Sequence, residues 1–135
     1  MDAFFANQGL LIEGVVHLSP REALAAVQRG AALVDLREVY ELETRRFDLP
    51  GVVFLPSSGL ASGFERLPKE QPLVLADSVG LRSKEALLWL RTRGFGQLAN
   101  LNGGIVDWER DGLPLDVVGH WVGGCVCKMR VRKTR

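Results

Sequence analysis

The sequence contains few of the residues that build metal centres or disulfide frameworks. Only two of its 135 residues are cysteine, Cys125 and Cys127, and only two are histidine. Two cysteines one residue apart make no disulfide framework, so nothing in the sequence indicates secretion. Beside these cysteines, His120 and the distant His17 are the remaining zinc ligands, which suffices at most for an incomplete or dimer-shared site. We therefore expect neither a metal nor a cofactor.

Long apolar runs are also missing. None approaches the ~20 residues that cross a membrane, and residues 1–5 lack the basic and apolar stretches of a signal peptide. We therefore expect a cytoplasmic protein with no membrane partner. A content of 47% hydrophobic and 24% charged residues is ordinary for a globular domain, and the chain is long enough to bury one core.

The net charge of +1 is the sum of a mildly acidic body and a basic tail, residues 118–135. The tail has five basic and no acidic side chains, whereas the rest of the chain has 12 basic against 16 acidic ones. Our main interpretation of the tail is a loose, solvated chain end. A basic run without interleaved aromatic residues is weak evidence for a nucleic-acid contact, so we do not expect nucleic acid as a partner.

Short apolar runs alternate with helical patterns along the chain. Strands are predicted at 14–18, 32–37, 52–55, 73–76 and 97–101, and helices at 19–30, 39–44, 81–94 and 105–110. A further short helix, anchored by Phe64 and Leu67, is predicted within the Gly- and Ser-rich segment 57–70. This alternation indicates an α/β fold, with a central five-stranded parallel sheet covered by helices on both faces. The predicted domain spans 14–117, between an N-terminal extension (1–13) and the basic tail with its Cys-x-Cys pair (118–135).

The clearest candidate site is the loop between the fourth predicted strand and the next helix. Its members are Asp77, Ser78, Val79, Gly80, Leu81 and Arg82. The N–H groups of such a loop and of the first helical turn converge on one point, where they stabilise negative charge. Asp35 and Arg37 end the second predicted strand at the same edge of the sheet, where ligands bind in parallel sheets. They are candidates for a supporting role, although an Asp that pairs with a neighbouring base is the commoner arrangement.

Four segments resemble the rhodanese-like (thiosulfate sulfurtransferase-like) family, in its single-domain form. They are Leu-Val-Asp-Leu-Arg-Glu at 33–38, Leu-Pro-Gly-Val-Val-Phe-Leu-Pro at 49–56, the loop segment 72–83 ending in Gly-x-Arg-Ser, and Leu-Asn-Gly-Gly-Ile-Val-Asp-Trp at 101–108 with Gly-Leu-Pro at 112–114. Their order and spacing match the family over about 100 residues. The resemblance implies the rhodanese-like three-layer fold.

The resemblance also implies that Asp77 stands where the family's sulfurtransferases have their nucleophilic Cys. In those enzymes the loop stabilises a thiolate, which takes a sulfur atom from a donor and passes it to a thiol or cyanide. A carboxylate forms no persulfide. The family's Gly-His before the second segment is replaced by Phe47-Asp48 as well. We therefore expect no rhodanese chemistry here, and interpret Asp77 as an internal anion that locks the loop, with Arg82 as its structural partner.

Two functions remain open after this comparison. The favoured one is a non-catalytic binding or regulatory module in sulfur metabolism or signalling, with an unidentified protein partner. The alternative is a sulfurtransferase or sulfur carrier that uses Cys125 or Cys127. Gly123-Gly124 would supply a hinge, and Lys128 and Arg130 would lower the pKa of either thiol. A sulfane-sulfur donor would be the partner.

Overall fold

The computed structural model describes residues 3–118 and 130–133. Its main sheet has six strands in the order β1-β2-β7-β6-β3-β5. They are β1 (Leu10–Ile12), β2 (Val15–Leu18), β3 (Ala32–Asp35), β5 (Val53–Phe54), β6 (Leu73–Ala76) and β7 (Leu98–Leu101). The five strands from β2 to β5 pair in parallel, which confirms the predicted five-stranded core. β1 was not predicted; it adds an antiparallel edge strand beside β2.

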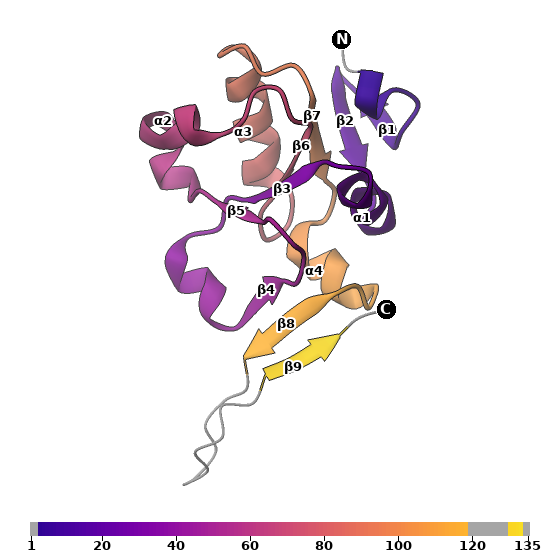
Figure 1. Ribbon diagram of the computed structural model, residues 1–135, viewed down its shortest axis with the longest axis vertical. Coiled ribbons are helices and arrows are strands. Elements are labelled where there is room, and N and C mark those ends of the chain that lie inside the picture. The colour runs from indigo at the N-terminus through magenta and orange to yellow at the C-terminus, as the bar shows by residue number, and fades with distance from the viewer. Residues whose placement is uncertain (1–2, 119–129, 134–135) are drawn as a thin grey trace, which may run out of the picture.

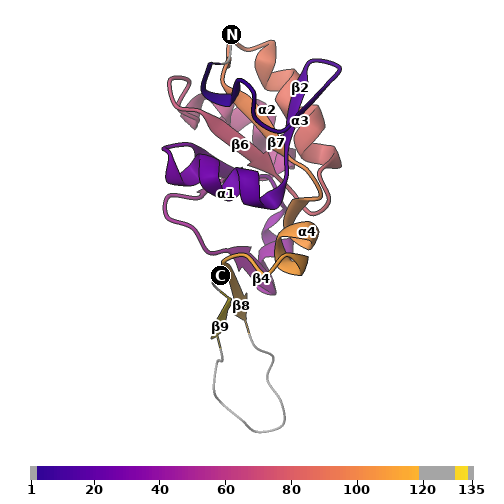
Figure 2. The ribbon, with the colours of Figure 1, turned by 90° about the vertical axis from the view of Figure 1, so that its right-hand side faces the viewer.

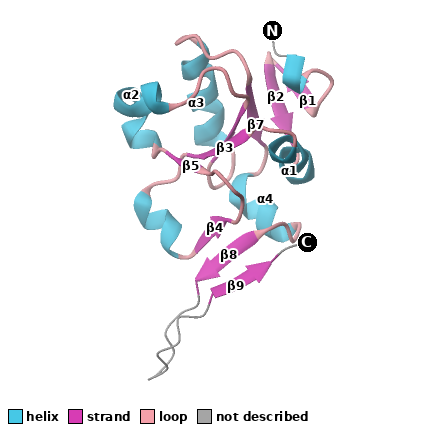
Figure 3. Cartoon of the chain, in the orientation of Figure 1, coloured by secondary structure: helices cyan, strands magenta, loops and turns pink. Residues whose placement is uncertain are grey.

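Helices cover both faces of this sheet (Figures 1 and 3). α1 (Pro20–Gln28) and α4 (Gly104–Arg110) pack on one face, and α2 (Leu60–Gly63) and α3 (Leu81–Arg91) on the other. Four 3-10 turns complete the described helical structure: η1 (Ala3–Phe5), η2 (Val39–Glu43), η3 (Ser57–Gly59) and η4 (Phe64–Arg66). No helix of the described segments is long and apolar enough to cross a bilayer.

Alternation of side chains along the strands produces the two cores. In β3, Leu33 belongs to the core under α1 and α4, whereas Val34 belongs to the core under α3. In β6, Val74 and Leu75 divide in the same way. Because both faces are covered, the central strands read as continuous apolar runs rather than as alternating ones.

The first helix begins where the sequence indicates. Ser19 is its N-cap, Pro20 is its first residue, and the Ser19 hydroxyl accepts the N–H of Glu22 at 3.2 Å. The Glu22 carboxylate accepts the N–H of Ser19 at 2.8 Å in return. This capping box satisfies two helix donors and fixes the crossover from β2 to α1.

A second, smaller sheet lies below α4 in Figure 2. It consists of β4 (Arg45–Phe47), β8 (Leu115–Val118) and β9 (Arg130–Lys133), all antiparallel, with β8 in the middle. β4 and β9 consist mostly of basic residues, and β8 is interrupted by Asp116, so none of the three shows the apolar run that predicted the strands of the main sheet. The interpretation of the tail as a loose end is wrong for Arg130–Lys133, because β8 pairs with this segment along the edge opposite β4. His120, Cys125 and Cys127 lie outside the described residues.

Candidate active-site loop

The loop lies between the end of β6 at Ala76 and the start of α3 at Leu81, as predicted. Gly80 adopts a left-handed φ of 98°, and a Cβ there would stand 3.2 Å from the backbone nitrogen of Gly103. Only glycine fits this turn without strain. The N-terminus of α4 holds the loop from the other side, because the N–H of Ile105 donates to the carbonyl of Asp77 at 2.9 Å.

The carboxylate of Asp77 points into the loop and is 1% exposed. Its Oδ1 accepts the backbone N–H of Gly80, and its Oδ2 accepts the N–H of Arg82 at 2.8 Å. The hydroxyl of Ser83 lies 3.4 Å from Oδ1. The side chain of Asp77 therefore uses the backbone donors that an external anion in this loop would need.

A chain of buried polar groups extends behind Asp77. The Ser83 hydroxyl donates to Oδ1 of Asn100, and Nδ2 of Asn100 donates to the carbonyl of Gly80 at 3.3 Å. The same Nδ2 lies 3.2 Å from Nδ1 of His17. Burial, and secondarily the charge of Lys84, lowers the pKa of His17, which favours the neutral ring that accepts this hydrogen bond. These contacts were not expected from the sequence; their one local signal is an Asn within the otherwise apolar strand β7.

The mouth of the loop is occupied by an ion pair between Arg82 and Glu41 of η2. Nη2 and Nη1 of Arg82 lie 3.0 and 3.2 Å from the two carboxylate oxygens of Glu41. Oε1 of Glu41 also accepts the Ser78 hydroxyl at 3.1 Å, and Nε of Arg82 lies 3.5 Å from Oδ2 of Asp77. The Arg82–Glu41 hydrogen bonds are the main cause of a raised Arg82 pKa and a lowered Glu41 pKa. Two carboxylates of the chain thus neutralise the only cation of the loop.

Asp35 and Arg37 form a buried ion pair and do not line the mouth of the loop. Their side chains are 0% and 2% exposed, and Nη2 of Arg37 lies 3.0 Å from Oδ2 of Asp35. The guanidinium also donates to the carbonyls of Glu41 and Arg45, at 3.1 and 3.0 Å. This pair therefore anchors η2 and β4, and through η2 it positions Glu41 over the loop.

We expect the Glu41→Gln substitution to reduce stability at neutral pH and to have no effect in acid. The lowered pKa of Glu41 means that its ion pair stabilises the fold above the unfolded-state pKa of about 4.3 and is lost as the pH falls through the lower folded-state value. Because Arg82 is partly exposed, the effect at pH 7 should be about 1 kcal/mol or less. Urea unfolding at pH 7 and at about pH 3 measures it.

Glu43→Gln is the matched control, because Glu43 lies on the same turn and its side chain is exposed. It should change the free energy of unfolding equally little at both pH values. A Glu41→Gln effect that persists undiminished at about pH 3 would show that the carboxylate charge is not what stabilises η2.

The strand–loop–helix at residues 73–91 lies within the part of the chain that a known protein family matches. The sequence-family model of the rhodanese-like domain matches residues 19–111. The chain belongs to the rhodanese-like family. It is 34% identical over 83 residues to a sulfurtransferase of Allochromatium vinosum, covering 62% of this chain and 76% of that protein.

This rhodanese-like chain also resembles part of a longer protein in sequence and a solved structure in fold. It is 34% identical over 101 residues to the probable adenylyltransferase/sulfurtransferase MoeZ of Mycobacterium tuberculosis, covering 72% of this chain but only 25% of that protein. A crystal structure of a rhodanese-related protein from Thermoplasma volcanium superposes with a TM-score of 0.67 at 21% identity, covering 73% of this chain and 95% of that one. The last comparison shows a shared fold.

The described part of this rhodanese-like chain contains no group of three or more His, Cys, Asp or Glu side chains that could hold a metal ion. The zinc ligands considered from the sequence, apart from His17, lie outside the described residues. Of the loop residues, Val79 and Leu81 are exposed at the rim, whereas Asp77 and Gly80 are buried. The residues brought together at the site are therefore Asp77, Ser78 and Arg82 with Glu41.

Proposed function

We propose that this rhodanese-like domain is a non-catalytic binding or regulatory module of the cytoplasm, acting in sulfur metabolism or signalling. The observation that supports this is the carboxylate of Asp77, which accepts the N–H groups of Gly80 and Arg82 inside the loop. Thiosulfate entering the loop would find these donors occupied and would meet a negative charge. The carboxylate oxygen is a poor nucleophile toward sulfane sulfur and makes no persulfide.

The surface around the loop suits a protein partner better than a small anion. Glu41 contacts Arg82, and the N–H of Val106 donates to the carbonyl of Ser78, so η2, the loop and α4 meet at this face. These three segments carry exposed apolar side chains: Val39, Tyr40, Val79, Leu81 and Val106. Gathered apolar side chains at the surface are a common mark of protein–protein contact.

A thiosulfate:cyanide sulfurtransferase assay tests the proposal. The wild-type chain and its Cys125→Ser/Cys127→Ser double variant should both lack activity. Activity that survives removal of both cysteines would contradict a non-catalytic role, because the loop itself would then be reactive.

The second candidate is a sulfur carrier that works through Cys125 or Cys127. One observation favours it: Val118 and Arg130, the described residues on either side of both cysteines in the sequence, pair in the small sheet. That sheet contains β4, which follows directly after η2. A persulfide adduct of about 32 Da on either cysteine after incubation with a sulfane-sulfur donor would support this function. Absence of the adduct, with a donor that loads the Asp77→Cys variant, would exclude it.

A further inference from the structure

β1 is the edge strand at one end of the main sheet. It pairs with β2 on one side, and no other described strand pairs with it. Leu10, Leu11 and Ile12 are 64%, 71% and 50% exposed, so all three residues of the strand present aliphatic surface. β1 is short, which by itself limits pairing at an edge, but its three residues include no charge, proline or bulge that would block it.

The turn after β1 determines which backbone groups face this edge. Ile12 pairs with Val15, and the two residues between them, Glu13 and Gly14, have φ values of 50° and 83°. Two positive φ values are typical of a type I′ hairpin turn, whose hydrogen bond joins Ile12 and Val15. In an antiparallel ladder, hydrogen-bonded residue pairs alternate with non-hydrogen-bonded pairs. Ile12 and Val15 form a hydrogen-bonded pair, so Leu11 belongs to a non-hydrogen-bonded pair, and its N–H and C=O point away from β2, toward the open edge.

We propose that β1 is a self-association edge, on which a second copy of this chain pairs antiparallel about a two-fold axis at Leu11. In this register the N–H and C=O of Leu11 bond to those of the second copy's Leu11, in both directions. Leu10 stands opposite the second copy's Ile12. Glu13 stands opposite the second copy's Gly9, so no like charges meet. Each residue of β1 thus lies opposite an apolar residue of the second copy, which makes the strand complementary to itself.

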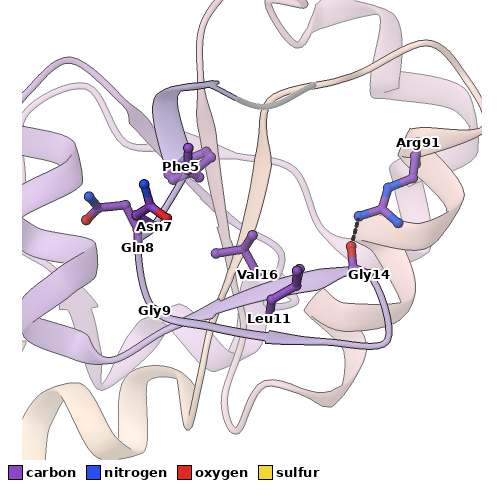
Figure 4. Close-up of a pocket in the computed structure, with 9 residues that line it drawn as sticks. Phe5, Asn7, Gln8, Gly9, Leu11, Gly14, Val16 and Arg91 are labelled. Carbon is purple, nitrogen blue, oxygen red and sulfur yellow. Dashed lines mark hydrogen bonds between the residues drawn. The ribbon is translucent and has the colours of Figure 1, made fainter.

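A cavity beside the hairpin adds apolar surface to this edge (Figure 4). It has a volume of about 440 Å³, and Phe5, Leu11 and Val16 line its apolar side. Leu11 and Val16 are paired in register, so both side chains lie on the same face of the sheet. In the proposed dimer the second copy's Leu11 lies on that face as well, where it extends the wall of the cavity and covers Leu11.

The hairpin is held firmly enough to present such an edge. Nη2 of Arg91, on α3, donates to the carbonyl of Gly14 at 2.7 Å, a contact drawn in Figure 4. A Cβ at Gly9 would stand 2.2 Å from the carbonyl oxygen of His17, so the chain preceding β1 lies close against β2. The ring of Phe5 is buried in the core. Because β1 is already held in place in the monomer, dimerisation would cost little further conformational entropy.

The oligomeric state tests the proposal. By sedimentation velocity the wild-type chain should form a weak, concentration-dependent dimer, because small interfaces are typical of transient association. Leu11→Pro should be monomeric, because proline removes the outward N–H and no hydrogen bond of the hairpin. Leu11→Lys should be monomeric as well, because it places two like charges opposite each other in the dimer. If the proline variant does not fold, the lysine variant is the test of the edge. Leu88→Lys changes an exposed aliphatic residue on α3 and should leave the dimer intact.

Two results would overturn the proposal. A wild-type chain that stays monomeric at every concentration would leave the edge to some other occupant, such as an extended peptide of another protein. A dimer that survives both Leu11 substitutions would have its interface elsewhere.

Cross-linking tests the register separately. In a background without Cys125 and Cys127, Leu11→Cys should form a disulfide-linked dimer under mild oxidation, because the Cα atoms of a hydrogen-bonded pair lie about 5.5 Å apart. Leu10→Cys should not, since its Cα would lie more than ~7 Å from its copy. Cross-linking of Leu10→Cys alone would contradict the two-fold axis at Leu11.

Discussion

Replacing Asp77 with Cys is expected to give this rhodanese-like domain a thiosulfate:cyanide sulfurtransferase activity that the wild-type chain lacks. The N–H groups of Gly80 and Arg82, which now bond to the carboxylate, would face the sulfur instead. Backbone donors and a helix N-terminus stabilise a thiolate and lower the pKa of its thiol. The activity should be partial, because Glu41 still neutralises Arg82.

The experiment uses the Cys125→Ser/Cys127→Ser background, so that the thiol introduced by Asp77→Cys is the only one in the chain. The pH dependence of alkylation should give a thiol pKa below the unperturbed value of about 8.5. Ser78→Cys is the matched control, since its side chain lies in the same loop but faces Glu41 rather than the loop N–H groups. Adding Glu41→Gln to Asp77→Cys should raise the activity further. A folded Asp77→Cys variant that is inactive, with a thiol pKa near about 8.5, would contradict the inferred loop geometry.

The Arg37→Ala substitution is expected to destabilise the domain by about 3–5 kcal/mol, the usual consequence of leaving a buried charge without its partner. Asp35 is 0% exposed, and Arg37 supplies both its ion pair and the donors to the carbonyls of Glu41 and Arg45. The loss should therefore also release η2 from the mouth of the loop. Urea unfolding measures the change.

Arg110→Ala is the control for a general effect of removing an arginine. Arg110 is 68% exposed and pairs with Asp107 and Asp111, so its removal should cost about 1 kcal/mol or less. The double variant Asp35→Leu/Arg37→Met should be more stable than Arg37→Ala, because it leaves no unpaired buried charge. An Arg37→Ala effect as small as that of Arg110→Ala would show that the pair does not organise this edge.

The parallel core was predictable because its signals are local. β3 and β6 are buried on both faces, so their apolar runs stand out, and Ser19 with Glu22 marks a helix start by spacing alone. β1 was not predictable in the same way. Its three residues are all apolar, so they show no alternation, and a run of three is shorter than the runs of four to eight that indicate a buried strand.

In the candidate site, too, contacts between residues close in the sequence were predictable, whereas contacts between distant residues were not. The contacts of Asp77 with Gly80 and Arg82 span three and five residues, so the loop's spacing was enough to expect them. Glu41 lies 41 residues before Arg82, and its position depends on a 3-10 turn held by Arg37. Asn100 and His17 meet across neighbouring strands, a relation that follows from strand order and not from either segment alone.

The central claim is that the carboxylate of Asp77 fills the anion site of its own loop. Backbone amide NMR of Gly80 and Arg82 tests it most directly, with thiosulfate titrated against sodium chloride of matched ionic strength. In the wild-type chain these two amide signals should show no saturable shift, whereas in Asp77→Ala, where the donors are released, both should move and saturate. Saturable shifts of both amides in the wild-type chain would contradict the account.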